Sequence, residues 1–531
     1  MVKRVAIVGA GVSGLSSIKC CLDEGLEPTC FERSSDIGGL WQYTEYVEEG
    51  RASLYESVVT NSSKEMSCYS DFPFPEDFPN FLPHPLFLEY LKMYADKFNL
   101  LKCIQFKTIV CNVKKCPDFS SSGQWEVTTE HEGKQESTIF DAVMVCTGYL
   151  TDPFLPLDTI PGISTFKGQY FHSREYKHPD LFKNKRVLVI GMGNSGADIA
   201  VDASRVAKKV LLSTTRGAWL INRLDHGCPS DIVFTSRFQS AFRDCLPTPV
   251  VNWLFAKKVN SWFDHENYGL VPESRTFIRE PVLNGELLGC INTGKVLIKA
   301  SVETVKENSV VFKNTPEEEP IDIIVFATGY TFAFPFLDES IVKVENNQAS
   351  LYKYIFPTHL EKPTLAVIGL IRTSTSLVCT TEIQARWVTR VLKGLTKLPS
   401  PEAMIEDVDK RKANKPTGFG LHFDMPLQED GVIYLDEISS FIDAKPNLLS
   451  LLLVDPLLAF KVFFGPLTSY QYRLTGPGKW DGARNAILTQ WDRIIKPTKT
   501  RIVQKRPDTF SYLLKVFSFL ALLVAVFLIF Q

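Results

Sequence analysis

The sequence has no marked excess of charge of either sign. Its 531 residues include 58 basic and 60 acidic side chains, which gives a formal net charge of −2. Proteins that bind nucleic acid neutralise phosphates with a basic patch or a basic excess. We therefore expect no nucleic-acid partner for this chain.

The sequence also lacks Cys-x-x-Cys pairs, although it contains 12 cysteines. Irregularly spaced cysteines of this kind are typical of reduced, mostly buried thiols in a reducing compartment. We expect neither a disulfide framework nor a metal site.

The N-terminus shows no secretory signal, because the apolar residues Val5–Val8 run directly into a glycine motif. At the other end, residues 510–530 are apolar with few exceptions, and about 20 such residues span the hydrocarbon layer of a bilayer. Basic residues between 496 and 506 precede this run, as on the cytosolic side of a tail anchor. We expect a C-terminal transmembrane helix at 510–530, with a buried terminal helix as the alternative.

The region before this tail, residues 446–509, is predicted to associate with the membrane. Within it, Leu448–Leu467 is strongly apolar and is interrupted at Asp455-Pro456. This stretch could instead pack in the core or form an interface in a homo-oligomer. The polar and charged residues 407–430 are predicted to form a surface loop.

A glycine motif follows the first predicted strand. Gly9-Ala-Gly11-Val-Ser-Gly14 stands between a buried strand at 4–8 and a helix at 12–24. In such a motif one glycine permits the tight turn, one lets the backbone approach a pyrophosphate, and one lets helix and strand pack closely. Glu32 stands 23 positions after Gly9, at the end of a second strand, where a carboxylate can bind a ribose diol. The region predicts a site for FAD or NAD, with these contacts: Gly9, Gly11, Ser13, Gly14, Glu32, Gly38, Gly39, Leu40 and Trp41.

A second glycine motif, Gly191-Met-Gly193-Asn-Ser-Gly196, stands between a strand at 187–190 and a helix predicted to run to about Ala207. The position 23 residues after Gly191 is Thr214 rather than an acid, and Arg216 follows it. A carboxylate would repel the 2′-phosphate of NADP, whereas a hydroxyl and a guanidinium would bind it. A solvated surface arginine is the alternative for Arg216. The predicted contacts are Gly191, Gly193, Asn194, Ser195, Gly196, Thr214, Thr215 and Arg216, with Arg223 as a second candidate for the phosphate.

Together these patterns predict an α/β chain with two Rossmann-like dinucleotide-binding folds, one for FAD and one for NADPH. Two similar strands, Phe140–Gly148 and Ile321–Gly329, each end in Thr-Gly and are predicted to carry the chain between the folds. The stretch 217–294 is rich in aromatic residues and Pro, which indicates a helical or irregular insertion that shapes substrate access. The predicted domains are 1–150 and 331–445 for FAD, 151–216 and 295–330 for NADPH, 217–294 for the insertion, 446–509 for the membrane-associating region and 510–530 for the anchor.

Two dinucleotide sites in one chain indicate that electrons pass from NADPH to a flavin. A disulfide reductase would hand them on to a redox pair of cysteines beside the flavin, and we expect no such pair here. Reduced flavin can instead react with O2.

At this point the motifs resemble a family. The pattern Phe166-x-Gly168-x-x-x-His172-x-x-x-Tyr176 is similar to the signature of the flavin-containing monooxygenases, whereas the related Baeyer–Villiger monooxygenases typically have Trp at its last position. Thr60–Met66, Ala327–Tyr330 and Gly476–Arg484 resemble the vertebrate microsomal members. The likeness runs from about residue 3 to the apolar tail.

The resemblance implies that NADPH reduces FAD and stays bound as NADP, and that O2 then forms a flavin hydroperoxide. A soft amine nitrogen or sulfur of a small lipophilic molecule attacks that group. The resemblance places Asn61 beside the flavin as the catalytic residue, where an amide can donate a hydrogen bond without adding charge. It also implies a single-pass anchor in the endoplasmic reticulum membrane. His172 and Tyr176 are expected to link the two nucleotide folds, and Lys64 and Glu65 could form a surface pair.

The sequence departs from the family pattern at three places. Tyr149 stands where the family usually has His, Arg372 where it often has Gln, and Asn284-Gly285-Glu-Leu-Leu288 where it often has Asn-Asp-Glu-Leu-Pro. Other functions therefore stay open at this point: Baeyer–Villiger oxygenation of ketones, an NADPH oxidase that releases hydrogen peroxide, and a non-catalytic membrane flavoprotein.

Overall fold

Two parallel five-stranded sheets organise the computed structural model, which describes residues 2–272, 281–413 and 427–501. The first sheet has the strand order β26 (Leu365–Val367), β7 (Ala142–Val145), β1 (Arg4–Val8), β2 (Glu27–Phe31) and β3 (Ile104–Gln105). The second has the order β16 (Val296–Lys299), β11 (Lys209–Ser213), β10 (Arg186–Ile190), β20 (Ile323–Phe326) and β9 (Gln169–His172). The prediction of an α/β chain built on two separate parallel sheets is thus confirmed.

Each glycine motif joins the central strand of its sheet to a helix, α1 (Val12–Asp23) or α4 (Asn194–Ala203). The central strands are apolar runs buried on both faces, as expected of parallel sheets covered by helices. Long helix α9 (Leu377–Leu392) packs against α1, so that a late segment of the chain covers the first sheet. Helix α4 ends four residues before the predicted Ala207.

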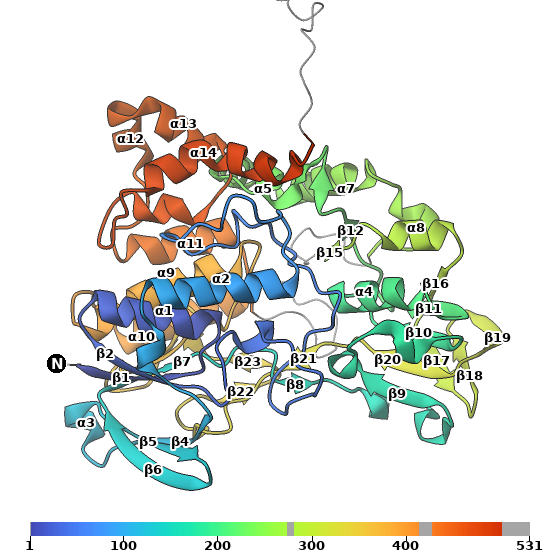
Figure 1. Ribbon diagram of the computed structural model, residues 1–531, viewed down its shortest axis with the longest axis horizontal. Coiled ribbons are helices and arrows are strands. Elements are labelled where there is room, and N and C mark those ends of the chain that lie inside the picture. Colours follow the sequence, from blue (N-terminus) through green and yellow to red (C-terminus); the bar gives the residue numbers. More distant parts are fainter. Residues whose placement is uncertain (1, 273–280, 414–426, 502–531) are drawn as a thin grey trace, which may run out of the picture.

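Two connections cross between the sheets, and the two predicted strands that end in Thr-Gly, β7 and β20, each lie beside the central strand of their sheet. Beyond these strands, β8 (Asp152–Pro153) pairs antiparallel with β21 (Tyr330–Thr331), so the outgoing and returning chain run side by side. Figure 1 shows this pair between the two sheets.

Each nucleotide-binding unit also carries an antiparallel three-stranded sheet, which the sequence analysis missed. The first consists of β4 (Thr108–Lys115), β5 (Trp125–His131) and β6 (Lys134–Phe140), and the second of β17 (Val302–Val305), β18 (Ser309–Phe312) and β19 (Thr315–Pro320). Their outer strands are largely exposed and polar, which weakens the alternation that identifies a strand in a sequence.

The insertion consists mainly of short helices and loops, as predicted. Its elements are β12 (Leu220–Ile221), β13 (Leu224–Asp225), β14 (Cys228–Pro229), α5 (Ser230–Phe234), α6 (Arg237–Asp244), α7 (Thr248–Asn260), β15 (Val282–Leu283) and α8 (Leu287–Asn292). The remaining elements are α2 (His84–Lys97), α3 (Phe119–Ser122), β22 (Val344–Glu345), β23 (Gln348–Ala349), β24 (Leu351–Tyr352), β25 (Phe356–Pro357), β27 (Arg372–Thr373), α10 (Pro401–Ala413), β28 (Gln428–Glu429) and α11 (Gly431–Ser440). The predicted loop at 407–430 is wrong in its first part, because residues 407–413 complete α10, whose Arg411 pairs with Asp407 one turn earlier.

The C-terminal region contains α12 (Leu448–Val454), α13 (Pro456–Phe464) and α14 (Ala483–Ile495). Asp455 caps α13, and the break at Asp455-Pro456 lets the two short helices fold into a hairpin. Phe464 of α13 contacts Phe238 of α6, with ring centroids 5.1 Å apart, so this region leans on the insertion (Figure 1).

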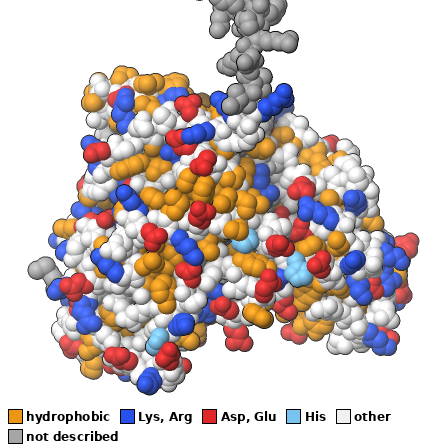
Figure 2. All heavy atoms as spheres, viewed as in Figure 1, with side chains coloured by type: hydrophobic (Ala, Val, Ile, Leu, Met, Phe, Trp, Pro, Cys, Tyr) orange, Lys and Arg blue, Asp and Glu red, His pale blue; other side chains and the backbone are white. Residues whose placement is uncertain are grey.

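The outer surface of this hairpin stays apolar. Figure 2 shows hydrophobic side chains gathered at the end of the molecule where it lies, and the exposed ones include Leu449, Leu453, Val454, Leu457, Phe460 and Phe464. Among the described residues, no helix is both long enough and apolar enough to cross a membrane. The predicted anchor at 510–530 lies outside those residues.

Candidate functional site

The first glycine turn cannot accept side chains at two of its glycines. Gly9 has φ +99°, and a Cβ built there would lie 2.9 Å from the carbonyl oxygen of Cys146. A Cβ on Gly14 would lie only 1.9 Å from the carbonyl oxygen of Gly9. Strand β1, helix α1 and the end of β7 therefore meet at the distance that only glycine allows.

The amino end of α1 is left open for an anion. Its N-cap is Gly11, which offers no side-chain acceptor to the first helical N–H groups. A second backbone segment passes directly opposite, because a Cβ on Gly11 would lie 3.6 Å from Cα of Gly39 and Gly38 N–H donates to the carbonyl of Ala10. Free N–H groups at a helix start, faced by glycine backbone, fit the pyrophosphate of a dinucleotide.

Glu32 lies just past β2 and is buried. One carboxylate oxygen accepts a hydrogen bond from Ala10 N–H at 2.7 Å, and the other accepts from the N–H and hydroxyl of Ser34 at 2.8 and 2.7 Å. The acid is thus fixed beside the glycine turn, as a ribose-binding carboxylate must be. The other predicted contacts lie around the same turn: Ser13 is buried on α1, and Leu40 and Trp41 belong to a short 3-10 helix after Gly38.

The second glycine turn repeats the first. Gly191 has φ +107°, and a Cβ there would lie 2.4 Å from the carbonyl oxygen of Ala327, while a Cβ on Gly196 would lie 2.0 Å from that of Gly191. Gly193 is the N-cap residue of α4, and no side chain accepts a hydrogen bond from the first N–H groups of that helix. Nothing lies within 4 Å of a Cβ built on Gly193. The protein itself leaves that space open, which fits close approach by a ligand.

The two positions counted from the glycines are structurally equivalent. In the first sheet Val8 pairs with Phe31, and in the second Ile190 pairs with Ser213, so Glu32 and Thr214 follow matching register positions. Thr214 accepts a hydrogen bond from Gly217 N–H at 3.1 Å, and Thr215 and half-buried Arg216 lie in the turn between them. This turn lies at the carboxyl end of β11, where a 2′-phosphate would be read.

Asn194 and Ser195 begin helix α4. The amide oxygen of Asn194 accepts a hydrogen bond from Leu283 N–H at 2.8 Å, which ties β15 of the insertion to the second glycine turn. The neighbouring Asn284 is buried, and its amide donates to Asp198 of α4 at 2.7 Å. Asn284, which agrees with the family pattern, therefore attaches the insertion to the second nucleotide fold.

Asn61 is exposed, and its amide oxygen accepts a hydrogen bond from Arg223 at 3.0 Å. The structure thus brings together two predicted residues that the sequence assigned to different cofactors. Asp231, which the sequence analysis missed, accepts a hydrogen bond from Ser63 N–H at 2.6 Å. Burial raises the pKa of Asp231 to about 6. A lone Asp within a Pro-rich insertion carries no sequence signal for such a contact.

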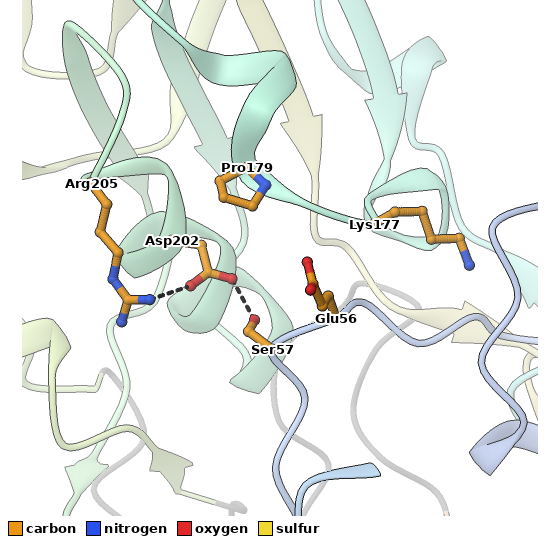
Figure 3. Close-up of a pocket in the computed structure, with 6 residues that line it drawn as sticks. All are labelled: Glu56, Ser57, Lys177, Pro179, Asp202 and Arg205. Atoms are coloured by element: carbon orange, nitrogen blue, oxygen red, sulfur yellow. Dashed lines mark hydrogen bonds and ion pairs between the residues drawn. The ribbon is translucent and has the colours of Figure 1, made fainter. Parts of the chain in front are cut away.

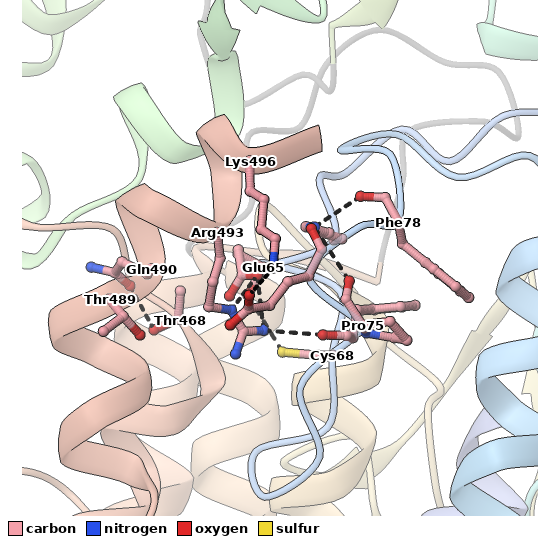
Figure 4. Close-up of polar contacts among 12 residues, drawn as sticks. Glu65, Cys68, Pro75, Phe78, Thr468, Thr489, Gln490, Arg493 and Lys496 are labelled. Carbon is pink, nitrogen blue, oxygen red and sulfur yellow. Dashed lines mark hydrogen bonds and ion pairs between the residues drawn. The ribbon is translucent and has the colours of Figure 1, made fainter. Parts of the chain in front are cut away.

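Lys64 and Glu65 do not form a surface pair, because both are completely buried. Lys64 donates to the carbonyls of Glu76 and Phe78 at 2.7 and 2.8 Å. Glu65 accepts from Arg493 of α14 at 3.0 Å and from the hydroxyl of Tyr470 at 2.9 Å (Figure 4). Burial lowers the pKa of Lys64 to about 8 and raises that of Glu65, with Arg493 opposing the rise. The alternation of charges in the sequence resembles a solvated face, and only the fold shows these buried partners.

The sequence analysis expected His172 and Tyr176 to link the two nucleotide folds, but their hydrogen bonds lie within the second fold. Buried His172 accepts from Arg174 N–H through Nδ1 and therefore donates through Nε2 to the carbonyl of Gly329, at 2.9 Å. Burial lowers its pKa to about 4, so the ring is neutral near pH 7. The Tyr176 hydroxyl donates to Asp202 of α4 at 3.1 Å.

A polar cavity of about 340 Å³ lies beside this contact (Figure 3). Asp202 accepts a hydrogen bond from Ser57 at 2.5 Å and pairs with Arg205 at 3.3 Å. Figure 3 shows Ser57 and Glu56 reaching it from the N-terminal segment, opposite α4. Segments of both folds therefore line the cavity, and none of its lining residues belongs to a glycine turn.

The other departures lie in ordered backbone. Arg372 is half-buried on β27, which pairs with β28, and its N–H donates to the carbonyl of Leu427 at 2.8 Å. Tyr149 is partly buried against the core of the first fold.

One cysteine spacing requires a correction to the expectation that the chain offers no redox pair. Cys111 and Cys116 are separated by four residues, a spacing found in some disulfide reductases. Cys111 lies within strand β4 and Cys116 immediately follows it. Five extended residues span roughly 16 Å, whereas a disulfide needs Cα atoms within about 7 Å. Both thiols are free, so this pair cannot form the redox disulfide of a reductase.

Comparison with known proteins agrees with this geometry. The model of the flavin-binding monooxygenase-like family matches residues 2–531. Flavin-containing monooxygenase 1 of Canis lupus familiaris is 73% identical over 517 residues, 97% of this chain and 97% of the relative. The N-oxide-forming dimethylaniline monooxygenase 2 of Macaca mulatta is 56% identical over 529 residues, 99% of each chain. Among solved structures, S-allyl-L-cysteine S-oxygenase from Allium sativum has the same fold, with a TM-score of 0.64 and 24% identity over 93% of this chain and 99% of that one.

Proposed function

The chain belongs to the flavin-binding monooxygenase-like family, and from this premise we propose that it oxygenates soft nitrogen and sulfur atoms of small lipophilic molecules. It is a flavin monooxygenase that uses FAD, NADPH and O2. The observation that carries the proposal is the pair of glycine turns, each with an open helix start, that differ at one equivalent position.

That difference supports an assignment of FAD to the first turn and NADPH to the second. Glu32 would bind the ribose diol of FAD at the first turn, and its negative charge would repel an additional phosphate. Thr214, Thr215 and Arg216 would bind the 2′-phosphate of NADPH at the second turn, because hydroxyl and guanidinium groups donate to phosphate oxygens. FAD, once bound, supplies the electron transfer from NADPH and the chemistry with O2.

The chain's own residues would do the positioning. Asn61 offers a neutral amide donor, which can hold a polar oxygen in place without adding charge. The insertion reaches both Asn61 and the second glycine turn, through Arg223 and through Leu283. It is therefore placed to exclude water and to shape the path of the substrate.

The names of two related proteins support the substrate class. One relative is named as forming N-oxides of dimethylaniline, and one protein with the same fold is named as an S-oxygenase. The amine nitrogen and the thioether sulfur that these names indicate are both nucleophiles with a lone pair on a small molecule. Tyr176 favours the same class over ketone oxygenation, because the Baeyer–Villiger pattern has Trp there.

We further propose a membrane-bound protein of the endoplasmic reticulum, anchored by residues 510–530. The exposed apolar side chains of α12 and α13 support a second contact with the bilayer surface. The alternative is that this face joins two copies of the chain in a homo-oligomer. Extraction of the full chain from microsomes with carbonate and with detergent, followed by sizing in detergent, would distinguish peripheral, anchored and oligomeric states.

The test of the catalytic proposal uses the purified full-length protein with FAD. NADPH oxidation, O2 uptake and product are measured with a thioether, a tertiary amine and a cyclic ketone. We expect sulfoxide and N-oxide in amounts close to the NADPH consumed. A lactone or ester as the main product would support Baeyer–Villiger oxygenation instead, and hydrogen peroxide equal to NADPH with every substrate would identify an oxidase.

A further inference from the structure

The insertion forms two hydrogen bonds with the segment that carries Asn61. Arg223, just after β12, donates a hydrogen bond to the side-chain oxygen of Asn61 at 3.0 Å. Asp231, in the first turn of α5, accepts one from the backbone N–H of Ser63 at 2.6 Å. We propose that Arg223 and Asp231 are positioning residues for Asn61, an inference that rests on the proposed function.

The Arg223 contact decides which end of the Asn61 amide faces outward. A guanidinium has only hydrogen-bond donors, so the amide must turn its oxygen toward Arg223. The NH2 group then points away from Arg223 and remains available as a donor. Without this partner the amide could turn by half a rotation and present an acceptor instead. Arg223 thereby sets the hydrogen-bonding character of Asn61 toward the cofactor.

The Asp231 contact fixes the backbone two residues further on. A carboxylate that accepts from a backbone N–H forms a charge-assisted hydrogen bond, roughly twice as strong as a neutral one. Asp231 is backed by Ile232, which packs in a small apolar cluster with Met66 of the Asn61 segment and Ile494 of α14. We call the contacts of Arg223 with Asn61 and of Asp231 with Ser63 the Asn61 clamp. The apolar cluster that supports it comes from three segments that are distant in sequence.

Arg223 is also held in place on its own side. Ser230 N–H donates to its backbone carbonyl at 2.8 Å, which closes the loop between β12 and α5. Its charge acts on Asp198 of α4, where it opposes the rise in the pKa of Asp198 that burial causes. Asp198 in turn accepts hydrogen bonds from Tyr55 and Asn284 at 2.8 and 2.7 Å. Arg223 thus lies between the NADPH fold and Asn61, so the place of the insertion on the NADPH fold affects where Asn61 lies.

This assignment differs from the role that the sequence suggested for Arg223, the binding of the 2′-phosphate. The two roles predict different measurements. A phosphate ligand contributes to NADP binding, whereas a positioning residue for Asn61 affects how the electrons of NADPH are used.

The experiment uses the full-length holoenzyme and the variants Arg223→Ala and Arg223→Lys. We expect the dissociation constant of NADP+, measured by fluorescence titration, to change less than threefold in Arg223→Ala. In Arg223→Ala we expect the fraction of NADPH electrons that appears as hydrogen peroxide to rise at least fivefold. In Arg223→Lys this rise should be about half as large, because the lysine ammonium can still donate a hydrogen bond to Asn61. In an Asn61→Ala background, Arg223→Ala should add no further peroxide release.

Asp231 is tested by hydrogen–deuterium exchange of peptides spanning residues 58–68, a readout that does not depend on turnover. Asp231→Ala should accelerate exchange in these peptides at least fivefold, whereas Asp231→Asn should stay within twofold because its amide oxygen can still accept from Ser63. The matched controls are Asp141→Ala, which removes a carboxylate that accepts from Lys3 and Arg4 N–H, and Arg205→Ala, which removes partly exposed ion pairs with Glu286 and with Asp202 of α4. Neither control should change peroxide release or exchange at 58–68.

Two results would overturn the proposal. One is an NADP+ dissociation constant more than tenfold higher in Arg223→Ala with unchanged peroxide release, since that identifies a phosphate ligand. The other is unchanged exchange at 58–68 in a folded, FAD-containing Asp231→Ala protein. Failure of the proposed function itself looks different, because the unmutated protein would then yield peroxide and no oxygenated product.

Discussion

Replacing glycines of the second turn separates packing from cofactor binding. A Cβ on Gly193 would meet no protein atom within 4 Å, and its φ of −97° suits any residue. We expect Gly193→Ala to leave the free energy of unfolding within about 0.5 kcal/mol of the original, as for an unstrained surface change. A methyl group there would nevertheless occupy the space through which a pyrophosphate reaches the start of α4. We expect the affinity for NADPH to fall at least tenfold, which corresponds to about 1.4 kcal/mol.

Gly196→Ala should behave in the opposite way. Its Cβ would lie 2.0 Å from the carbonyl oxygen of Gly191 and 3.2 Å from Cβ of Ala327, so strand and helix must move apart. Overpacking of this kind typically costs about 1–3 kcal/mol. NADPH binding should therefore be lost together with thermal stability, because the turn itself is displaced.

The matched control is Gly289→Ala. Gly289 lies on α8, is exposed, and a Cβ there would also meet nothing within 4 Å. Alanine in a helix is about 0.5–1 kcal/mol better than glycine, so this variant should be as stable as the original or more so. The assays are thermal denaturation, the flavin absorbance that reports FAD content, and fluorescence titration with NADPH. Unchanged NADPH affinity in a stable, FAD-containing Gly193→Ala protein would refute the assignment of this turn to the dinucleotide.

Three further predictions use other features of the structure. Thr214→Glu should raise the KM for NADPH at least tenfold and the KM for NADH less, because the carboxylate repels the 2′-phosphate that only NADPH carries. Steady-state kinetics with both coenzymes test this. An equal rise in both KM values would show that residue 214 does not contact the phosphate. The pKa of Asp231 is raised to about 6 by burial, so the folded protein binds more protons than the unfolded chain between about pH 4 and 6, and stability should fall as pH rises through that window. The melting temperature of the unmutated protein should therefore fall relative to that of Asp231→Asn as pH rises from about 4 to 6, and curves that stay parallel would contradict the raised pKa. Glu65→Leu should cost about 3–5 kcal/mol of unfolding free energy, because it leaves Arg493 buried and uncompensated, whereas the double variant Glu65→Leu, Arg493→Met should recover part of this loss in denaturant titrations.

The elements that the sequence predicted well are those whose signal is local. Strand β1, helix α1 and their counterparts β10 and α4 follow from apolar runs interrupted by glycines, because the turn chemistry depends on a few adjacent residues. The matching register of Glu32 and Thr214 could be counted from the same pattern. Local patterns of this kind carry the two nucleotide sites.

The parts that were missed depend on residues far apart in the chain. Glu65 meets Arg493 over 428 positions, and Ser63 meets Asp231 over 168, distances at which no periodicity or spacing gives a signal. Lys64 and Glu65 looked like a solvated pair because charged residues are almost always exposed unless partners neutralise them, and their partners are carbonyl groups and a distant arginine. The fold was required to show that these charges are buried.

These long-range contacts connect the C-terminal region with the predicted catalytic segment. Helix α14 holds Glu65 through Arg493 and contributes Ile494 to the cluster that also contains Ile232, next to Asp231. The carbonyl of Ile494 also accepts a hydrogen bond from Asn80, at 2.8 Å. Since α14 precedes the proposed anchor, a membrane contact at that end of the molecule would act on the same apolar cluster that supports the Asn61 clamp. Transfer of the protein from detergent to a bilayer should then change the ratio of peroxide to oxygenated product more than it changes the affinity for NADPH. The reason is that the second glycine turn packs against the end of β20 and not against this cluster.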